Sequence, residues 1–378
     1  MGTWFERQRN ILDFTLSALV RRKGKNLSLL LVYTFLVFLL SSVMFFTHAL
    51  RKEAALVLAN APEMVVQRMS AGRHELMPAR YLGGIKGIKG VSNVRGRLWG
   101  YYFDPVPGAN YTLLVQEDGP SLNGTISIGR GISRARLAEP GDLIAFQTYD
   151  GTPMVLKVRD VFSPESELVS SDLMVLTEQD FRKLFGLPPD VYTDIILTVR
   201  NAKEVATVAG KVQKLLPDTR PIMKSEILRT YDTIFDWRSG IIVVLLSSAV
   251  LAFIIFAWDK ASGLSAEERK EIGILKAIGW ETSDVLLMKF WEGACVSLTS
   301  FLAGVLLAYV HVFFTGVVLF EPVLKGWSTL YPSFKLVPFI SPYQVATLFF
   351  LTVVPYTVAT IVPSWRAATI DPDSVMRS

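Results

Sequence analysis

Side chains that commonly do chemistry are scarce in this sequence of 378 residues, which has three histidines (His48, His74 and His311) and one cysteine (Cys295). His311 has no acid or second histidine beside it, so we expect an interhelical hydrogen bond rather than proton or metal chemistry. Cys295 is expected to be a packing residue. Residues 51–239 contain one histidine, no cysteine, no G-x-S-x-G turn and no zinc-spaced cluster. We therefore predict a non-catalytic chain without a bound metal.

A nucleotide-binding loop is also missing from the sequence. The closest stretch, "GGIKGIKG" at 83–90, has glycines and lysines but not the Lys-Ser/Thr pair that holds phosphate and magnesium. The chain is therefore expected to bind no cofactor and to hydrolyse no ATP alone.

The most informative charged segment is "SAEERKEIGILKAIGW" at 265–280, which lies between two apolar stretches. Ser265 and Glu268 match a capping box, and Gly279 stands where a helix favours a left-handed residue. We predict a helix over Ala266–Ile278, about 20 Å long at 1.5 Å per residue. It is too short and too charged to span a bilayer, so it should lie on the cytoplasmic surface.

Helical spacing divides this segment into two faces. Glu271 falls within an apolar sector, where a carboxylate is costly to desolvate unless a cation meets it. We predict that this face docks on another protein and that Glu271 meets a basic residue there. In the alternative orientation, the apolar face packs on the chain's own helices and the basic face is presented to the partner. The apolar sector holds Ile272, Ile274, Leu275 and Ile278, and the other sector holds Arg269, Lys270, Gly273, Lys276 and Ala277.

Four apolar stretches are long enough to cross a membrane, in a chain with 51% hydrophobic residues. Basic residues concentrate before the first stretch, so the positive-inside rule places both termini in the cytoplasm. The predicted organisation is a cytoplasmic amphipathic helix at 1–25, spans at 26–50, 240–258, 293–320 and 344–362, an α/β extracytoplasmic domain with a stalk at 51–239, a cytoplasmic coupling region at 259–292, a short outer loop at 321–343 and a cytoplasmic tail at 363–378. Basic residues beside the spans explain the net charge of +5 without a nucleic acid.

The outer domain is predicted to be folded and mixed α/β. Apolar, β-branched runs at 112–116, 142–149, 153–162 and 194–200 predict strands. Helices are predicted at 177–186 and 201–217. A further helix before the second span should act as a rigid stalk, with Ile227, Tyr231, Ile234 and Phe235 near one face.

Three stretches resemble the FtsX/MacB-type permeases, the type VII ABC transporters. They are "EERKEIGILKAIGWETSDVLLMKFWEG" at 267–293, "PSWRAATIDPDSVMR" at 363–377 and, more weakly, "IGRGISRARLAEPGDLIAF" at 128–146. The resemblance implies four spans with a large insertion after the first. It also implies an ATPase-coupling role for the cytoplasmic helix, with Glu268, Arg269, Glu271, Ile272, Ile274, Leu275, Lys276, Ile278 and Gly279 as candidate residues.

The resemblance further implies the partners and the mechanism. A separate cytoplasmic ATPase dimer would bind ATP and Mg, a second permease copy or paralogue would pair with this chain, and a periplasmic adaptor or lipoprotein is a possible further partner. ATP-driven movement would pass to the outer domain and export or extract lipoprotein, lipid or other envelope cargo at a bacterial inner membrane. Two alternatives stay open: a complex that regulates an envelope hydrolase, and a membrane-anchored sensor or secondary transporter.

Overall fold

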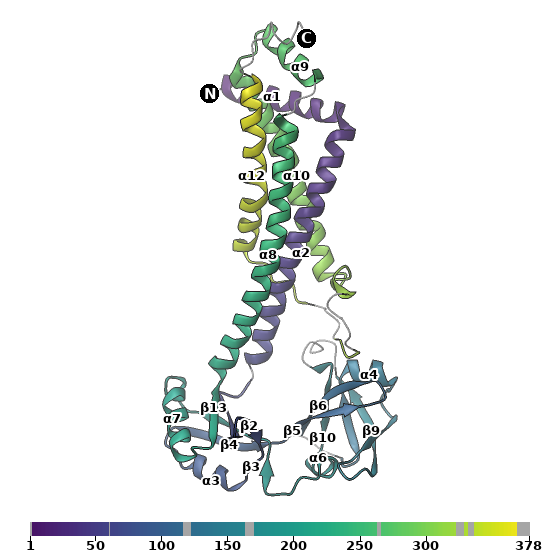
Figure 1. The fold of residues 1–378 in the computed structure, drawn as a ribbon, viewed down its shortest axis with the longest axis vertical. Coiled ribbons are helices and arrows are strands. Elements are labelled where there is room, and N and C mark those ends of the chain that lie inside the picture. The colour runs from purple at the N-terminus through teal and green to yellow at the C-terminus, as the bar shows by residue number, and fades with distance from the viewer. Residues whose placement is uncertain are drawn as a thin grey trace. The chain divides into compact units, whose positions relative to one another are not determined.

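The computed structural model describes residues 2–59, 61–115, 122–162, 170–262, 266–322, 329–331 and 336–368. The chain forms two compact units (Figure 1). The helical unit comprises Met1–Arg51, Phe235–Thr315 and Leu336–Ser378. The α/β unit comprises Lys52–Ile234 and Gly316–Lys335.

The helical unit contains six long helices in the described ranges. They are α1 (Gly2–Arg21), α2 (Lys23–Ala59), α8 (Lys224–Ser262), α9 (Ala266–Ala277), α10 (Thr282–Phe313) and α12 (Pro342–Ala368), with α2 and α8 continuing into the α/β unit. The interfacial helix predicted at 1–25 is α1, and the predicted stalk helix is the first part of α8.

In the described part of the chain, three helical stretches are long and apolar enough to cross a membrane: Asn26–Glu53, Thr282–Phe313 and Pro342–Ile361. The predicted third span, 293–320, begins and ends later than the helix that contains it, α10. That helix starts at Thr282, after a capping box, and ends at Phe313, before the positive φ angles of Gly316 and Val317. In α8, the apolar stretch found among the described residues is shorter, Leu246–Ile255. A fourth span at 240–258 therefore stays a prediction.

Small and polar side chains hold the helical unit together. A Cβ added at Gly293 would lie 2.4 Å from the Thr360 hydroxyl oxygen, so the glycine permits close approach of α10 and α12. Tyr33 of α2 stacks on Phe253 and Tyr356 and donates a hydrogen bond of 2.6 Å to a carbonyl of α12. His311 of α10 lies 3.2 Å from the Ser42 hydroxyl, which confirms the predicted interhelical contact.

The α/β unit contains a five-stranded sheet with the order β13-β1-β12-β4, to which β2 is added beside β1. Its elements are β1 (Met64–Ser70), β2 (Arg73–Glu75), α3 (Arg80–Lys86), β4 (Val91–Arg97), β12 (Asp194–Val199), α7 (Val205–Leu215) and β13 (Thr219–Met223). Two βαβ units, β1-α3-β4 and β12-α7-β13, interleave in a ferredoxin-like arrangement. Ile85 of α3 and Val208 and Val212 of α7 complete the core on one face of this sheet.

A six-stranded sheet is inserted between β4 and β12, with the order β5-β6-β10-β7-β9-β8. Its elements are β5 (Trp99–Asp104), β6 (Ala109–Val115), β7 (Thr125–Ile128), α4 (Arg130–Arg136), β8 (Leu143–Gln147), β9 (Pro153–Val161), β10 (Leu173–Leu176) and α6 (Glu178–Phe185). Ile132 of α4 and Phe181 and Leu184 of α6 pack into its core. A short pair, β3 (Met77–Pro78) and β11 (Val191–Tyr192), completes the unit.

The four strand predictions are confirmed by β6, β8, β9 and β12. The helix predicted at 177–186 is α6, where the Thr177 hydroxyl caps the first turn and Gly186 adopts a φ of 67° after the last. The helix predicted at 201–217 begins with a 3₁₀ turn, Ala202–Glu204, before α7.

Candidate coupling site

The segment that the sequence marks as a coupling helix is α9, joined tightly to α10. Gly279 has a φ of 104°, and the Trp280 amide donates a hydrogen bond of 3.0 Å to the Leu275 carbonyl, as in a Schellman motif. Glu281 then caps α10 in a reciprocal capping box with Asp284. A stop signal at the end of α9 is thus followed directly by a start signal for α10. Ser265 and the side chains of Glu268 and Arg269 lie outside the described residues.

The inner face of α9 packs against its own chain. Ile272 and Leu275 are each only 6% exposed. They form one cluster with Ile11 of α1 and with Val285 and Met288 of α10. The predicted assignment of the whole apolar sector to a partner protein is therefore wrong for these two residues, because α1 and α10 already cover them.

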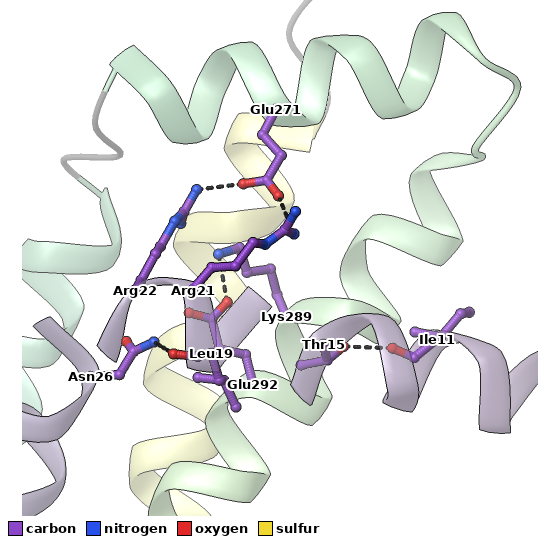
Figure 2. A network of polar contacts seen from close by, with 9 residues as sticks. All are labelled: Ile11, Thr15, Leu19, Arg21, Arg22, Asn26, Glu271, Lys289 and Glu292. Carbon is purple, nitrogen blue, oxygen red and sulfur yellow. Dashed lines mark hydrogen bonds and ion pairs between the residues drawn. The ribbon is translucent and has the colours of Figure 1, made fainter. Parts of the chain in front are cut away.

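Glu271 also has its cations within the chain. The end of α1 brings Arg21 and Arg22 to the Glu271 carboxylate (Figure 2). The Arg21 guanidinium lies 3.2 Å from one carboxylate oxygen, and Arg22 donates to the other. The structure thus supplies from α1 the basic partner that the sequence placed on another subunit. We call this contact of Glu271 with Arg21 and Arg22 the arginine clasp.

A second polar contact ties α1 to the start of α10. Arg7 donates to Asp284 at 2.5 and 2.9 Å and to the Ser283 hydroxyl at 3.2 Å. The hydrogen bond to Asp284 raises the pKa of Arg7 above its ordinary value. Further along, the Trp291 indole donates to Gln8 at 3.1 Å. Because the same α1 also holds α9 through the clasp, the three helices form a single platform.

The platform extends into the first turns of α10. Lys289 is nearly buried and lies 2.6 Å from Glu292, one turn further along the same helix (Figure 2). The Thr15 hydroxyl of α1, also buried, donates to the Ile11 carbonyl at 2.7 Å. Each of these buried polar groups therefore has a partner, as burial requires.

The outer face of α9 is the part that a partner can reach. Ile274 is 49% exposed and Ile278 is 70% exposed, and Lys270 and Ala277 are exposed on the same side. The predicted coupling residues are thus divided: Glu271, Ile272 and Leu275 face the chain, Ile274 and Ile278 face outward, Lys276 is half-buried and Gly279 ends the helix.

The sequence analysis did not predict the arginines that make these contacts. Arg7, Arg21 and Arg22 belong to the basic residues before the first apolar stretch, which served there only to predict membrane orientation. Their signal was an adjacent pair of arginines at the end of one amphipathic helix, combined with one unpaired carboxylate on the apolar stripe of another. Sequence alone could not show that these two helices meet.

The other predicted sites are placed as follows. Ile227, in the stalk part of α8, is half-buried, while the side chains of Tyr231, Ile234 and Phe235 lie outside the described part of the chain. No group of three or more His, Cys, Asp or Glu residues in the described ranges could hold a metal ion.

Comparison with known proteins identifies the C-terminal part of the chain. Residues 239–372 match the model of the FtsX-like permease C-terminal family. Two solved structures are similar, at low identity, to parts of this chain. One is the extracellular domain of the noncanonic ABC-type transporter YknZ from Gram-positive bacteria (13% identity, TM-score 0.30, 42% of this chain and 98% of that chain). The other is the periplasmic region of MacB from Actinobacillus actinomycetemcomitans (12% identity, TM-score 0.32, 45% of this chain and 92% of that chain). Comparison with curated proteins gives no match.

Proposed function

From the premise that this chain carries an FtsX-like permease C-terminal domain, we propose that it is the permease subunit of an ABC transporter driven by a separate ATPase. The outer face of α9, with Ile274 and Ile278, receives the ATPase dimer. ATP and Mg belong to that partner. The chain itself is non-catalytic and converts the ATPase stroke into movement of the α/β unit.

The observation that carries this proposal is the α1–α9–α10 platform. A helix that transmits force must not roll or slide when it is pushed. The arginine clasp and the buried Ile272 and Leu275 hold α9 on one side. The opposite side keeps two apolar side chains accessible for a partner.

The remaining parts of the proposal concern location and cargo. We place the protein in a bacterial inner membrane with both termini in the cytoplasm, because six basic residues precede the first apolar stretch, Asn26–Glu53. The α/β unit then lies on the outer side. Its size, with one sheet inserted into another, favours handling of a lipoprotein, lipid or other envelope cargo over a purely regulatory role.

Purification from native membranes in mild detergent tests the proposal. We expect a nucleotide-binding subunit to co-purify and to hydrolyse ATP, and the isolated chain to hydrolyse none. Ile274→Asp and Ile278→Asp should each release that subunit, because they place a carboxylate in an apolar contact. The matched control is Val106→Asp in the α/β unit, where the side chain is 72% exposed against 70% for Ile278. ATP hydrolysis by the isolated chain, or full retention of the ATPase by both α9 variants, would refute the proposal.

A further inference from the structure

The two sheets of the α/β unit are attached to different helices. The chain enters the unit from α2 into β1 and leaves it from β13 into α8. Both β1 and β13 belong to the five-stranded sheet, where they are hydrogen-bonded neighbours, with Met64 opposite Met223. The pair α2 and α8 therefore holds the five-stranded sheet directly.

The segment between α10 and α12 makes a separate connection. It leaves the helical unit after Thr315, belongs to the α/β unit over Gly316–Lys335, and returns at Leu336. Within it, residues 316–322 and 329–331 are described. Leu330 packs against the core of the six-stranded sheet. This segment, which follows α10 and precedes α12, thus reaches the sheet that α2 and α8 do not enter.

Polar contacts fix the same two residues. Arg134 of α4 donates a hydrogen bond of 2.5 Å to the Tyr331 carbonyl, and its guanidinium carbon lies 5.3 Å from the centre of the Tyr331 ring. The Ser171 hydroxyl donates to the Leu330 carbonyl at 3.3 Å. The α/β unit therefore contacts the backbone carbonyl and the side chain of both Leu330 and Tyr331.

The receiving surface is itself rigid. A Cβ added at Gly129 would lie 1.8 Å from the Ser170 carbonyl oxygen, so the turn into α4 is pressed against the segment before β10. The Ile132 amide also donates to the Ser171 carbonyl at 3.2 Å. Arg134 and Ser171, which donate hydrogen bonds to Tyr331 and Leu330, are thus fixed relative to one another.

We propose that Leu330 and Tyr331 form a second mechanical anchor, which ties the six-stranded sheet to the helix pair α10 and α12. Relative movement of the two helix pairs then becomes relative movement of the two sheets. The inference rests on the proposed function, because ATP hydrolysis by the partner supplies the movement.

The region between the sheets is where such movement would act on a ligand or partner. A cavity of about 440 Å³ is lined by residues in or leading into the five-stranded sheet, among them Glu63, Arg95 and Arg97, and by Leu114 of β6 in the six-stranded sheet. Sliding or rotation of one sheet against the other changes the width of this cavity.

The anchor can be tested first by cross-linking. In a Cys295→Ala background, Ser171→Cys combined with Leu330→Cys should form an intramolecular disulfide under mild oxidation of native membranes. The two single-cysteine variants serve as controls for cross-links between molecules. Absence of the disulfide, with both cysteines alkylated as fast as in the exposed Leu137→Cys variant, would show that Leu330 does not dock at Ser171 and would overturn the inference without touching the proposed function.

The transmission step needs a distance measurement between the sheets. Spin labels at Leu137→Cys, where the side chain is 89% exposed after α4, and at Gln213→Cys, exposed on α7, report the separation of the two halves. In the complex purified with its ATPase, we expect the distance distribution to shift on trapping with ATP and vanadate. Arg134→Ala with Leu330→Ala should abolish the shift while ATP turnover stays within about twofold.

The outcomes distinguish failure of the proposed function from failure of the anchor alone. No shift in the unaltered complex would contradict the proposed function, and with it this inference. A shift that persists in the Arg134→Ala, Leu330→Ala variant would overturn the anchor alone. The Ser171–Leu330 disulfide should leave the shift intact, because it only makes a native contact permanent. Arg73→Ala, an exposed arginine on the five-stranded sheet, is the control and should behave as the unaltered complex.

Discussion

Glu271 shows how a correct physical argument at a single residue can lead to the wrong neighbour. A carboxylate on an apolar stripe does require a cation, and the structure provides two. The cations come from α1, about 250 positions earlier in the chain. Helical spacing reveals the need for a partner but holds no information on which distant element supplies it.

A charge exchange tests the arginine clasp. Glu271→Arg and Arg22→Glu should each reduce retention of the ATPase, because each places like charges at a half-buried contact worth on the order of 1 kcal/mol. The double variant should restore part of the retention, since Arg22→Glu then faces Glu271→Arg while Arg21 still opposes the introduced positive charge. If Glu271 instead pairs with the ATPase, the double variant will be no better than the single ones. Arg9→Glu is the control, because Arg9 is exposed on the same helix and forms its ion pair with Asp13 of that helix.

The turn between β8 and β9 allows a prediction about pH. Hydrogen bonds from the Thr148 hydroxyl, at 2.5 Å, and from the Thr152 amide lower the pKa of Asp150 from its ordinary 3.8 to about 2. The stabilisation is therefore present above pH 4 and is lost as the pH falls toward 2, because only the unfolded state binds the proton in that interval. Asp150→Ala should lower the Tm of the purified chain at pH 6 and lower it less at pH 3. An equal or larger difference at pH 3 would contradict the assigned contacts.

At the scale of elements, the sequence predicted where helices and strands occur and where they end better than it predicted which elements pack together. Gly279 marked the end of α9, and Thr177 and Gly186 marked both ends of α6, since capping depends on residues within one turn. The strands β6, β8, β9 and β12 were visible as apolar runs. The division of α9 into a buried and an exposed face could not be predicted, because it depends on where α1 and α10 pack.

The helix α8 offers a test of transmission at the level of one element. It is continuous over Lys224–Ser262, from the end of β13 into the helical unit. Thr233→Pro should break it, since proline lacks the amide hydrogen and clashes with the preceding turn, at a cost of about 3 kcal/mol or more. We expect ATP hydrolysis by the complex to survive and the distance shift in the α/β unit to be lost. Thr233→Ala is the control, and retention of the shift in the proline variant would exclude α8 from transmission.

At the scale of the whole molecule, composition predicted a membrane protein with a folded α/β domain, and the described residues contain three apolar helices and two large sheets. The sheet order could not be predicted. The strand β4 pairs with β12 rather than with β5, which follows it directly, so the five-stranded sheet is assembled from two distant stretches of chain. Pairing of this kind depends on burial by α3 and α7 together, which no local pattern encodes.

That interleaving has a consequence for biosynthesis. When β1, α3 and β4 have been synthesised, the strands that complete their sheet, β12 and β13, have not been made. Met64 and Val66 of β1, fully buried in the finished protein, then lack their neighbouring strands until the entire inserted sheet has been synthesised. The inserted sheet contains its own core and can fold in the interval. The nascent chain therefore passes through a stage in which the five-stranded sheet is still incomplete, and chaperones would encounter it with β1 and β4 as open edges.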